Sequence, residues 1–235
     1  MRDCQGPAND RRIQRRPRAL PFGLAAVCFT LAGAVSGAAA GGPVTAPRWV
    51  SFGASSGATQ LDGRLADYQW DTGWRASWGA ELLAGRGPIG LGVRYRTLST
   101  SQDMAAAGIT PSPSVRLGAF EWVGRIRMAE ALGTRMLATC SAGRMSLAYH
   151  PDHATVNTGG APVTVNLTSI HEWTGGAGLA VERGLGSAWN VSIGVDYTAF
   201  SLDTAHRNGA GIVYGRDRFG DWNGRFEMAR VFAWR

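Results

Sequence analysis

Several features that identify common protein classes are scarce or missing in this sequence of 235 residues. It has only three cysteines, which excludes a disulfide-rich scaffold, and no lysine, so every one of its 24 basic residues is an arginine. After residue 47 it has no apolar run of about 18 residues, so we expect no transmembrane helix there. Charged residues make up 17% of the chain and hydrophobic residues 45%, which excludes a disordered tail.

The formal net charge of +7 does not indicate a nucleic-acid-binding protein. Residues 1–40 hold six arginines and two aspartates, a charge of +4, which leaves 18 arginines and 15 acidic residues, or +3, for the rest. Because so small an excess makes no basic face, we expect no nucleic-acid partner. The sequence also has no glycine motif that binds phosphate and no zinc-finger spacing, so we expect no cofactor.

The first 40 residues are organised like a secretory signal peptide. Five arginines lie between residues 11 and 18, no charge occurs from 19 to 47, and an apolar stretch covers roughly 20–35. Small residues follow at 36–41, as a signal peptidase requires. We therefore interpret residues 1–40 as a cleaved signal peptide, with an uncleaved membrane anchor as the alternative.

Cleavage would leave a short periplasmic segment, 41–47, and one domain, 48–235. The domain keeps a single cysteine, Cys140, which we expect to be a small buried apolar residue rather than a nucleophile.

This domain repeats a pattern of alternating apolar and polar residues, which is typical of β-strands. In 89–96, large apolar residues alternate with glycine and arginine. Tryptophans at positions 70, 74 and 78 also fit one face of a helix, but the glycine and threonine between them favour a strand. The pattern predicts eight strands, at 48–59, 68–84, 88–100, 114–129, 134–149, 163–182, 189–202 and 221–234.

The predicted connections alternate in length. Those after the second, fourth and sixth strands are short, whereas about 60–67, 101–113, 150–162 and 203–220 are longer and polar. Short turns at one end and long loops at the other predict an all-β, antiparallel, up-and-down barrel. Both ends of the domain would lie on the side of the short turns.

One face of the predicted strands is polar and carries equal numbers of acids and arginines. Such balance suits a crowded interior, because an unpaired buried charge costs several kcal/mol. A membrane barrel places its polar face inside, whereas a soluble lipocalin-like carrier places its apolar face there. We expect a lumen network of ion pairs made by Asp71, Arg75, Glu81, Arg94, Arg96, Glu121, Arg125, Arg127, Arg144, Glu172, Glu182, Asp196, Arg225 and Glu227.

The other face is apolar, and aromatic residues gather near the strand ends, as the interfacial girdles of membrane barrels require. Each predicted strand also supplies the roughly 9–11 residues needed to cross the hydrocarbon. We expect these side chains to face lipid or its interfaces: Trp49, Trp70, Trp74, Trp78, Tyr95, Trp122, Trp173, Trp189, Tyr197, Trp222, Phe226, Phe232 and Trp234.

With this architecture, residues 48–235 resemble the small eight-stranded outer-membrane β-barrels of Gram-negative bacteria, of the OmpA/OmpX type and the opacity type. The most local match is the alternating aromatic strand 226–234, although Arg235 follows its last aromatic residue and Arg230 lies on its apolar face. Arg230 can extend its charge to the interface if it lies near the periplasm.

The resemblance implies an exported outer-membrane monomer that contacts lipid and lipopolysaccharide. It also implies recognition of strand 226–234 by the barrel-assembly machinery. Eight strands leave a lumen that side chains fill, so we expect no wide diffusion pore. The role would then be structural, or lie in surface interactions of the long loops, with an extracellular partner that the sequence does not identify.

Two other functions have weaker sequence support. Some barrels that this chain resembles are lipid A-modifying hydrolases, and Ser169, His171 and Glu172 are the candidates for such catalysis here. Alternation puts Ser169 and His171 side by side but Glu172 on the opposite face, so we expect an interfacial histidine rather than an enzyme. A soluble lipocalin-like carrier is the second alternative, because 72–74 faintly resembles the Gly-x-Trp signature of that family.

The only cluster that resembles a metal site consists of His150, Asp152 and His153. These residues offer three ligands within four positions, but no fourth ligand is visible. We expect a polar surface turn there and no bound metal.

Overall fold

The computed structural model describes residues 47–105, 109, 112–156, 162–208 and 211–234. The predicted signal peptide, 1–40, lies outside these residues, as do the rest of the segment before Pro47 and the final residue, Arg235. No helix in the described part of the chain is long and apolar enough to cross a membrane.

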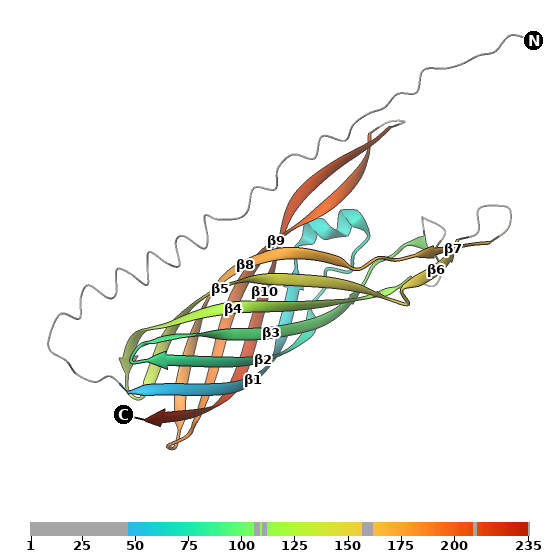
Figure 1. Cartoon of the computed structure of the whole chain (residues 1–235). Coiled ribbons are helices and arrows are strands. Elements are labelled where there is room, and N and C mark those ends of the chain that lie inside the picture. The colour runs from blue at the N-terminus through green and yellow to red at the C-terminus, as the bar shows by residue number, and fades with distance from the viewer. Residues whose placement is uncertain (1–46, 106–108, 110–111, 157–161, 209–210, 235) are drawn as a thin grey trace, which may run out of the picture.

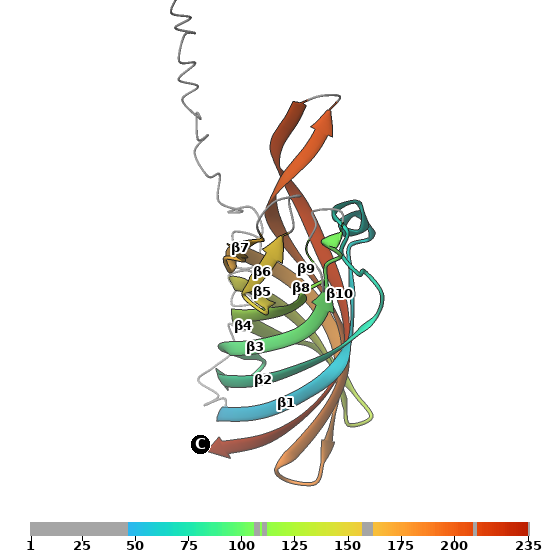
Figure 2. The same ribbon diagram turned by 90° about the vertical axis from the view of Figure 1, so that its right-hand side faces the viewer.

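The chain forms a closed, eight-stranded antiparallel barrel, which confirms the predicted fold (Figures 1 and 2). Each strand pairs with its neighbours along the chain, and the barrel closes where the first strand pairs with the last, from Arg48 opposite Trp234 to Leu61 opposite Asp221. The barrel strands are β1 (Arg48–Leu61), β2 (Arg75–Arg86), β3 (Ile89–Ser101), β4 (Ser114–Ala131), β5 (Thr134–His150), β8 (Ile170–Leu185), β9 (Trp189–Asn208) and β10 (Gly211–Trp234).

Tight turns join strands at one end of the barrel, which we call the turn end. Gly87, Gly133 and Gly186 lie in these turns with positive φ angles of 57°, 72° and 73°, a conformation that glycine adopts without strain. The start of β1 and the end of β10 lie at the same end (Figure 1). The opposite end, which we call the loop end, carries the longer connections, so the predicted alternation of connection lengths is confirmed.

The predicted strand 68–84 is wrong at its start. Residues Gly63–Tyr68 form the short 3-10 helix η1, and β2 begins only at Arg75. The carboxylate of Asp62 accepts a hydrogen bond from the backbone N–H of Arg64 at 3.0 Å, which caps η1. Alternation in the sequence does not reveal this helix, because six residues, or two turns of a 3-10 helix, are too few to show a period.

Two further boundaries differ from the prediction. The predicted strand 163–182 is divided into β7 (Val163–Asn166) and β8, and β7 pairs with β6 (His153–Val156) in a separate small sheet. The predicted loop 203–220 is mostly strand, because β9 and β10 continue as a hairpin that projects beyond the barrel (Figure 2). Beyond the rim neither face of a hairpin packs on a core, so the alternation of hydropathy disappears while backbone pairing continues.

Candidate functional site

The lumen holds most of the charged side chains that the sequence assigned to it. Strand alternation turns these residues inward, and each has a relative exposure of 8% or less. The buried members of the predicted network are Glu81, Arg94, Arg96, Glu121, Arg125, Glu182, Asp196, Arg225 and Glu227.

At mid-height, two arginines share one carboxylate, and one of them also binds a second. Arg94 on β3 binds Glu121 on β4, with Nη2 3.0 Å from Oε2, and also reaches Asp196 on β9 at 3.3 Å. Arg225 on β10 reaches the same oxygen of Asp196 with its Nε at 3.2 Å. Strands on opposite sides of the barrel are therefore bridged through its centre.

Hydroxyl groups complete the coordination of these carboxylates. Thr139 donates a hydrogen bond to Asp196 at 3.1 Å, and Ser141 donates one to Glu121 at 3.2 Å. The two donors lie on the inward face of β5, one on each side of Cys140. Satisfied oxygens reduce the cost of keeping carboxylates away from water.

Toward the turn end a second group surrounds Arg125. This guanidinium binds the carboxylate of Glu81 and, at 3.1 Å, that of Glu227. Arg225 approaches Glu227 at 3.6 Å, which links this group to the one above it. Glu182 lies beside it and is bound at 3.3 Å by Arg135, which the prediction did not include in the network.

Toward the loop end the network finishes in a two-point ion pair. Arg96 donates to the two oxygens of Asp221 at 2.7 and 3.2 Å and to the hydroxyl of Thr198 at 2.9 Å. Asp221 is 2% exposed, and the prediction missed it. It lies on the same face as Asn223 and Arg225, so the alternation extended by one step would have identified it.

Beyond Arg96 and Asp221 the interior becomes apolar. The same inward faces now carry leucine, valine and phenylalanine, and η1 adds Leu65, which is 2% exposed. The prediction of a polar lumen is therefore wrong for this part of the barrel. The apolar section consists of Leu61, Leu65, Trp70, Leu98, Val115, Leu117, Ala119, Met145, Leu147, Phe200, Leu202 and Phe219.

The boundary between the two sections leaves little free space. A cavity of about 10 Å³ lies there, between the Arg96–Asp221 pair and the side chains of Leu98, Leu117 and Met145. That volume is close to the minimum that one water molecule needs.

Arg144 does not enter the lumen, so this part of the prediction is wrong. It lies exposed on the outside of β5, with its guanidinium 5.9 Å from the ring centre of Trp173. Leu137, Met145 and Leu147 occupy the inward positions of this strand instead. Because β5 has apolar residues on its inward face, the alternation of hydropathy does not show which face of this strand points into the lumen.

Four other predicted network charges lie at the ends of the barrel, outside the buried network. Asp71 and Arg75 form an ion pair with each other at the loop end, where both are partly exposed. Arg127 binds Glu130 at 3.2 Å near the turn end, beside an irregularity in the β4–β5 register. Glu172 is bound by Arg216 of the projecting hairpin.

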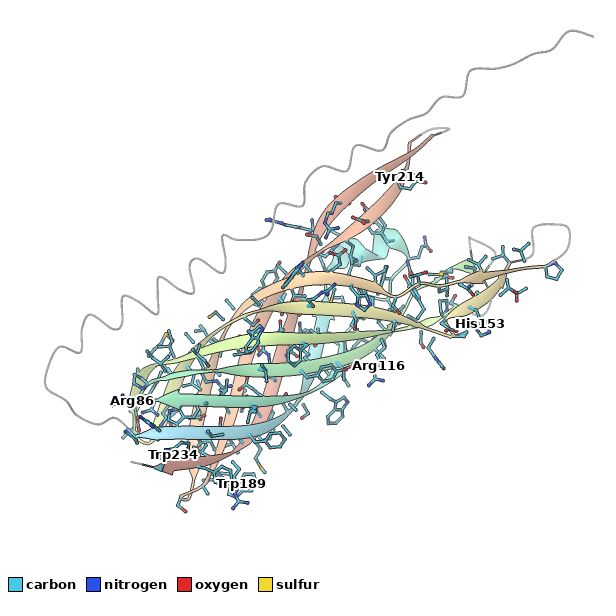
Figure 3. All side chains as sticks on the ribbon, in the orientation of Figure 1. Arg86, Arg116, His153, Trp189, Tyr214 and Trp234 are labelled. Atoms are coloured by element: carbon cyan, nitrogen blue, oxygen red, sulfur yellow. The ribbon has the colours of Figure 1, made fainter. Side chains whose placement is uncertain are left out.

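Most of the predicted outer aromatic residues are exposed on the outside of the wall, with exposures from 39% to 68%. Two of them, Trp189 and Trp234, are labelled in Figure 3. Tyr197 and Trp222 contact each other there, with ring centres 4.9 Å apart. Arg230 also lies on this surface, 5.9 Å from the ring of Trp189 and 5.0 Å from that of Phe232. The exposed predicted residues are Trp74, Trp78, Tyr95, Trp122, Trp173, Trp189, Tyr197, Trp222, Phe226, Phe232 and Trp234.

Trp49 and Trp70 are wrongly predicted as outer residues. Trp49 lies inside the turn end, where its indole N–H donates to the carbonyl of Gly87 at 3.2 Å. A Cβ on Gly85 or Gly90 would lie 2.4 Å from its ring, so only glycines accommodate it. Trp70 is 7% exposed and belongs to the apolar section.

The candidate catalytic residues do not assemble. Ser169 lies just before β8 and is exposed, as is His171. Glu172 is engaged by Arg216, and no hydrogen bond joins any two of the three candidates. Because a nucleophile, its base and an orienting acid must lie within hydrogen-bond reach, the structure provides no triad here.

The candidate metal ligands are exposed at the start of β6. His153 and Asp152 share a hydrogen bond of 2.9 Å, which lowers the pKa of Asp152. His150 does not join them, and the described residues contain no group of three or more side chains that could hold a metal ion.

No protein-family model and no curated protein matches this sequence. Solved structures with a similar fold include Neisserial surface protein A, 10% identical over 79% of this chain and 97% of its own, with a TM-score of 0.49. A major outer membrane protein of Thermus thermophilus is 12% identical over 78% and 99%, with a TM-score of 0.42. The outer membrane protease OmpT of Escherichia coli is 6% identical over 80% and 98%, with a TM-score of 0.37. At these identities the likeness concerns only the fold, which is the one expected from the resemblance to outer-membrane barrels.

Proposed function

We propose that this chain is an integral β-barrel of a Gram-negative outer membrane, with a closed lumen and a structural or surface-interaction role. The observation that carries the proposal is the polarity of the wall. Charged side chains such as Arg94 and Glu121 are buried inside, whereas Trp78 and Trp122 are more than 60% exposed outside. In water this arrangement would expose a broad apolar surface, whereas lipid would cover it.

The wall has the dimensions that the proposal needs. The shortest barrel strand, β2, has 12 residues, and about 9–11 tilted residues cross the hydrocarbon of a bilayer. A soluble carrier of the lipocalin type needs an apolar cavity at mid-height, and here ion pairs occupy that place. The polarity therefore favours the membrane barrel over the carrier.

The asymmetry of the two ends supports an orientation. Outer-membrane barrels have short turns in the periplasm and longer loops outside the cell. We therefore assign the turn end to the periplasm and the loop end, with its projecting hairpin, to the exterior. Strand β10 would present the alternating aromatic residues of 226–234 to the assembly machinery, and the barrel would work as a monomer.

The contents of the lumen support a closed barrel. The charged section bridges opposite walls, and the apolar section with η1 fills the loop end. A refolded barrel should therefore show no large, stable conductance in planar lipid bilayers. A steady open level of the size that a wide pore gives would contradict the closed lumen. Because the residues 169–172 form no triad, no specific observation favours a hydrolase.

The experiment that tests the membrane assignment is electrophoresis of the membrane fraction with and without boiling. A folded barrel should resist the detergent and change its mobility on boiling. The mass of the processed chain should also fall by about 40 residues, since a secretory leader of this kind is removed on export. A soluble periplasmic protein without a mobility shift would contradict the proposal.

A further inference from the structure

The outer wall at the turn end carries two arginines that directly face each other across a strand pair. Arg48 on β1 is the register partner of Arg86 on β2, and both are exposed. Their even positions place them on the outward face with Val50 and Ala84. Like charges directly opposite each other in a sheet are destabilising. Such a pair therefore needs a compensating anion or costs stability.

Neither arginine finds that anion within the described part of the chain. No ion pair there includes Arg48 or Arg86. By contrast, Arg127 and Arg135, at the same end of the barrel, share the carboxylate of Glu130 at 3.2 and 3.5 Å. These two ion pairs show that some guanidinium groups at the turn end do have a carboxylate partner.

An apolar groove begins beside the two charges. It is shallow and open, and it lies on the outside of the β2–β3 hairpin next to its turn, where it is lined by Ala84, Gly85, Arg86, Ile89 and Leu91. The next residues toward mid-height are also apolar. Trp234, the register partner of Arg48 on its other side, is 47% exposed and closes the row (Figure 3).

We propose that this surface, made by Arg48, Arg86 and the adjoining groove, binds one anionic phospholipid of the periplasmic leaflet. The two guanidinium groups would hold the phosphodiester by charge-assisted hydrogen bonds, for which the planar fork of arginine is suited. One acyl chain would lie along Ala84 and Leu91, where a small side chain leaves the groove open. The inference rests on the proposed membrane location and on the assignment of the turn end to the periplasm.

The test uses the refolded mature chain in detergent with added phosphatidylglycerol, or with phosphatidylcholine, and counts retained lipids by native mass spectrometry. We expect phosphatidylglycerol to be retained in preference. Arg48→Gln and Arg86→Gln should each reduce its retention about fivefold or more, because each removes one of two charged donors. Equal retention by wild type and both variants would overturn the inference, as would equal retention of the two lipids by wild type.

Two further variants separate the site from general charge. Arg183→Gln removes an exposed arginine at the same end, on β8, whose register partners are Thr134 and Val191. It should change retention less than about twofold, because the site contains no residue of β8. Ala84→Trp keeps both charges but fills the groove, and it should reduce retention as strongly as Arg86→Gln. A loss in Arg183→Gln equal to that in Arg86→Gln would contradict a local site.

Electrophoresis with and without boiling is run on every variant. A wild-type barrel that shifts on boiling but shows no preference for phosphatidylglycerol overturns only this inference. A wild-type chain that does not shift overturns the proposed function itself.

Discussion

The two sections of the lumen use the same inward strand positions but different chemistry. The charged section is held by individual pairings, such as Arg94 with Glu121 and Arg96 with Asp221, and each group has specific partners. The apolar section is held by packing among side chains such as Leu117 and Phe219, which depends on volume rather than on a particular partner. One alternating pattern can therefore specify two kinds of interior. The difference in chemistry also predicts different responses to substitution.

The largest effect is expected in the charged section. Arg94→Met leaves Glu121 and Asp196 without a shared counter-charge and should lower the free energy of unfolding by about 3–5 kcal/mol. The measurement is equilibrium unfolding in urea, in lipid vesicles. Arg144→Met is the matched control, because this arginine lies outside on β5, and it should cost less than about 1 kcal/mol. Similar losses in both variants would contradict the special role of the lumen pairs.

The apolar section should tolerate a change of shape better than a loss of volume. Leu117→Ala removes a side chain that is 4% exposed and should cost about 2–4 kcal/mol. Leu117→Met keeps the volume and should cost less than about 1.5 kcal/mol. Both values come from the same urea titrations. If the two substitutions cost the same, packing does not determine the stability of this section.

An intermediate effect is expected where the two sections meet. Asp221→Asn keeps the shape but removes the charge that binds Arg96 at two points, and it should cost about 1–3 kcal/mol. Thr198 still accepts from the same guanidinium, which limits the loss. Asp203→Asn is the exposed control, on the projecting hairpin, and should have little effect on unfolding. If both variants lower the free energy of unfolding equally, the Arg96–Asp221 pair has no special role where the two sections meet.

The smallest effect concerns η1, which covers the loop end of the apolar section. Hydrogen bonds from the side chain of Arg64 lower the pKa of Asp62 below its ordinary value of 3.8. A carboxylate with a lowered pKa stabilises the fold above that value, and its contribution is lost as the pH falls through the lowered pKa. The protection of the amide protons of 63–68 against hydrogen exchange, measured relative to the intrinsic exchange rate at each pH, should therefore be higher at pH 6 than well below pH 3.8.

Asp62→Ala supplies the control for that pH effect. It should remove the pH dependence and cost about 0.5–1 kcal/mol, as the loss of a helix cap does. Unchanged pH dependence in the variant would assign the effect to another group.

The alternation of hydropathy was sufficient to predict the barrel, because inward and outward positions differ wherever the wall separates lumen from surroundings. It failed where that difference ends. The hairpin of β9 and β10 continues beyond the rim, where Tyr214 and Arg216 are exposed and no core imposes alternation, so most of 203–220 resembles a loop in the sequence. Trp70 belongs to a segment that folds back over the loop end, and no strand period governs its orientation.

The candidate network could be predicted only in part for a related reason. Periodicity gives the face of a residue but not its height along the barrel or its partner. Asp71 and Arg75 lie too near the loop end to be buried. Arg144 lies on the outward face of β5, because the inward face of this strand mixes Leu137 and Met145 with Thr139 and Ser141. The sequence did not predict the apolar section, because an apolar residue that faces inward has the same hydropathy as an apolar residue that faces outward.

In the proposed arrangement charge lies inside this wall and lipid outside it, and Cys140 allows a direct test. It lies on β5 between Thr139 and Ser141, whose hydroxyl groups point into the lumen, and its own side chain therefore points outward. A nitroxide spin label on this cysteine, in the mature chain refolded into bilayers, can be tested for relaxation by oxygen and by a water-soluble nickel complex. We predict strong relaxation by oxygen and little by nickel. Strong relaxation by nickel and little by oxygen would contradict a lipid-facing outer wall.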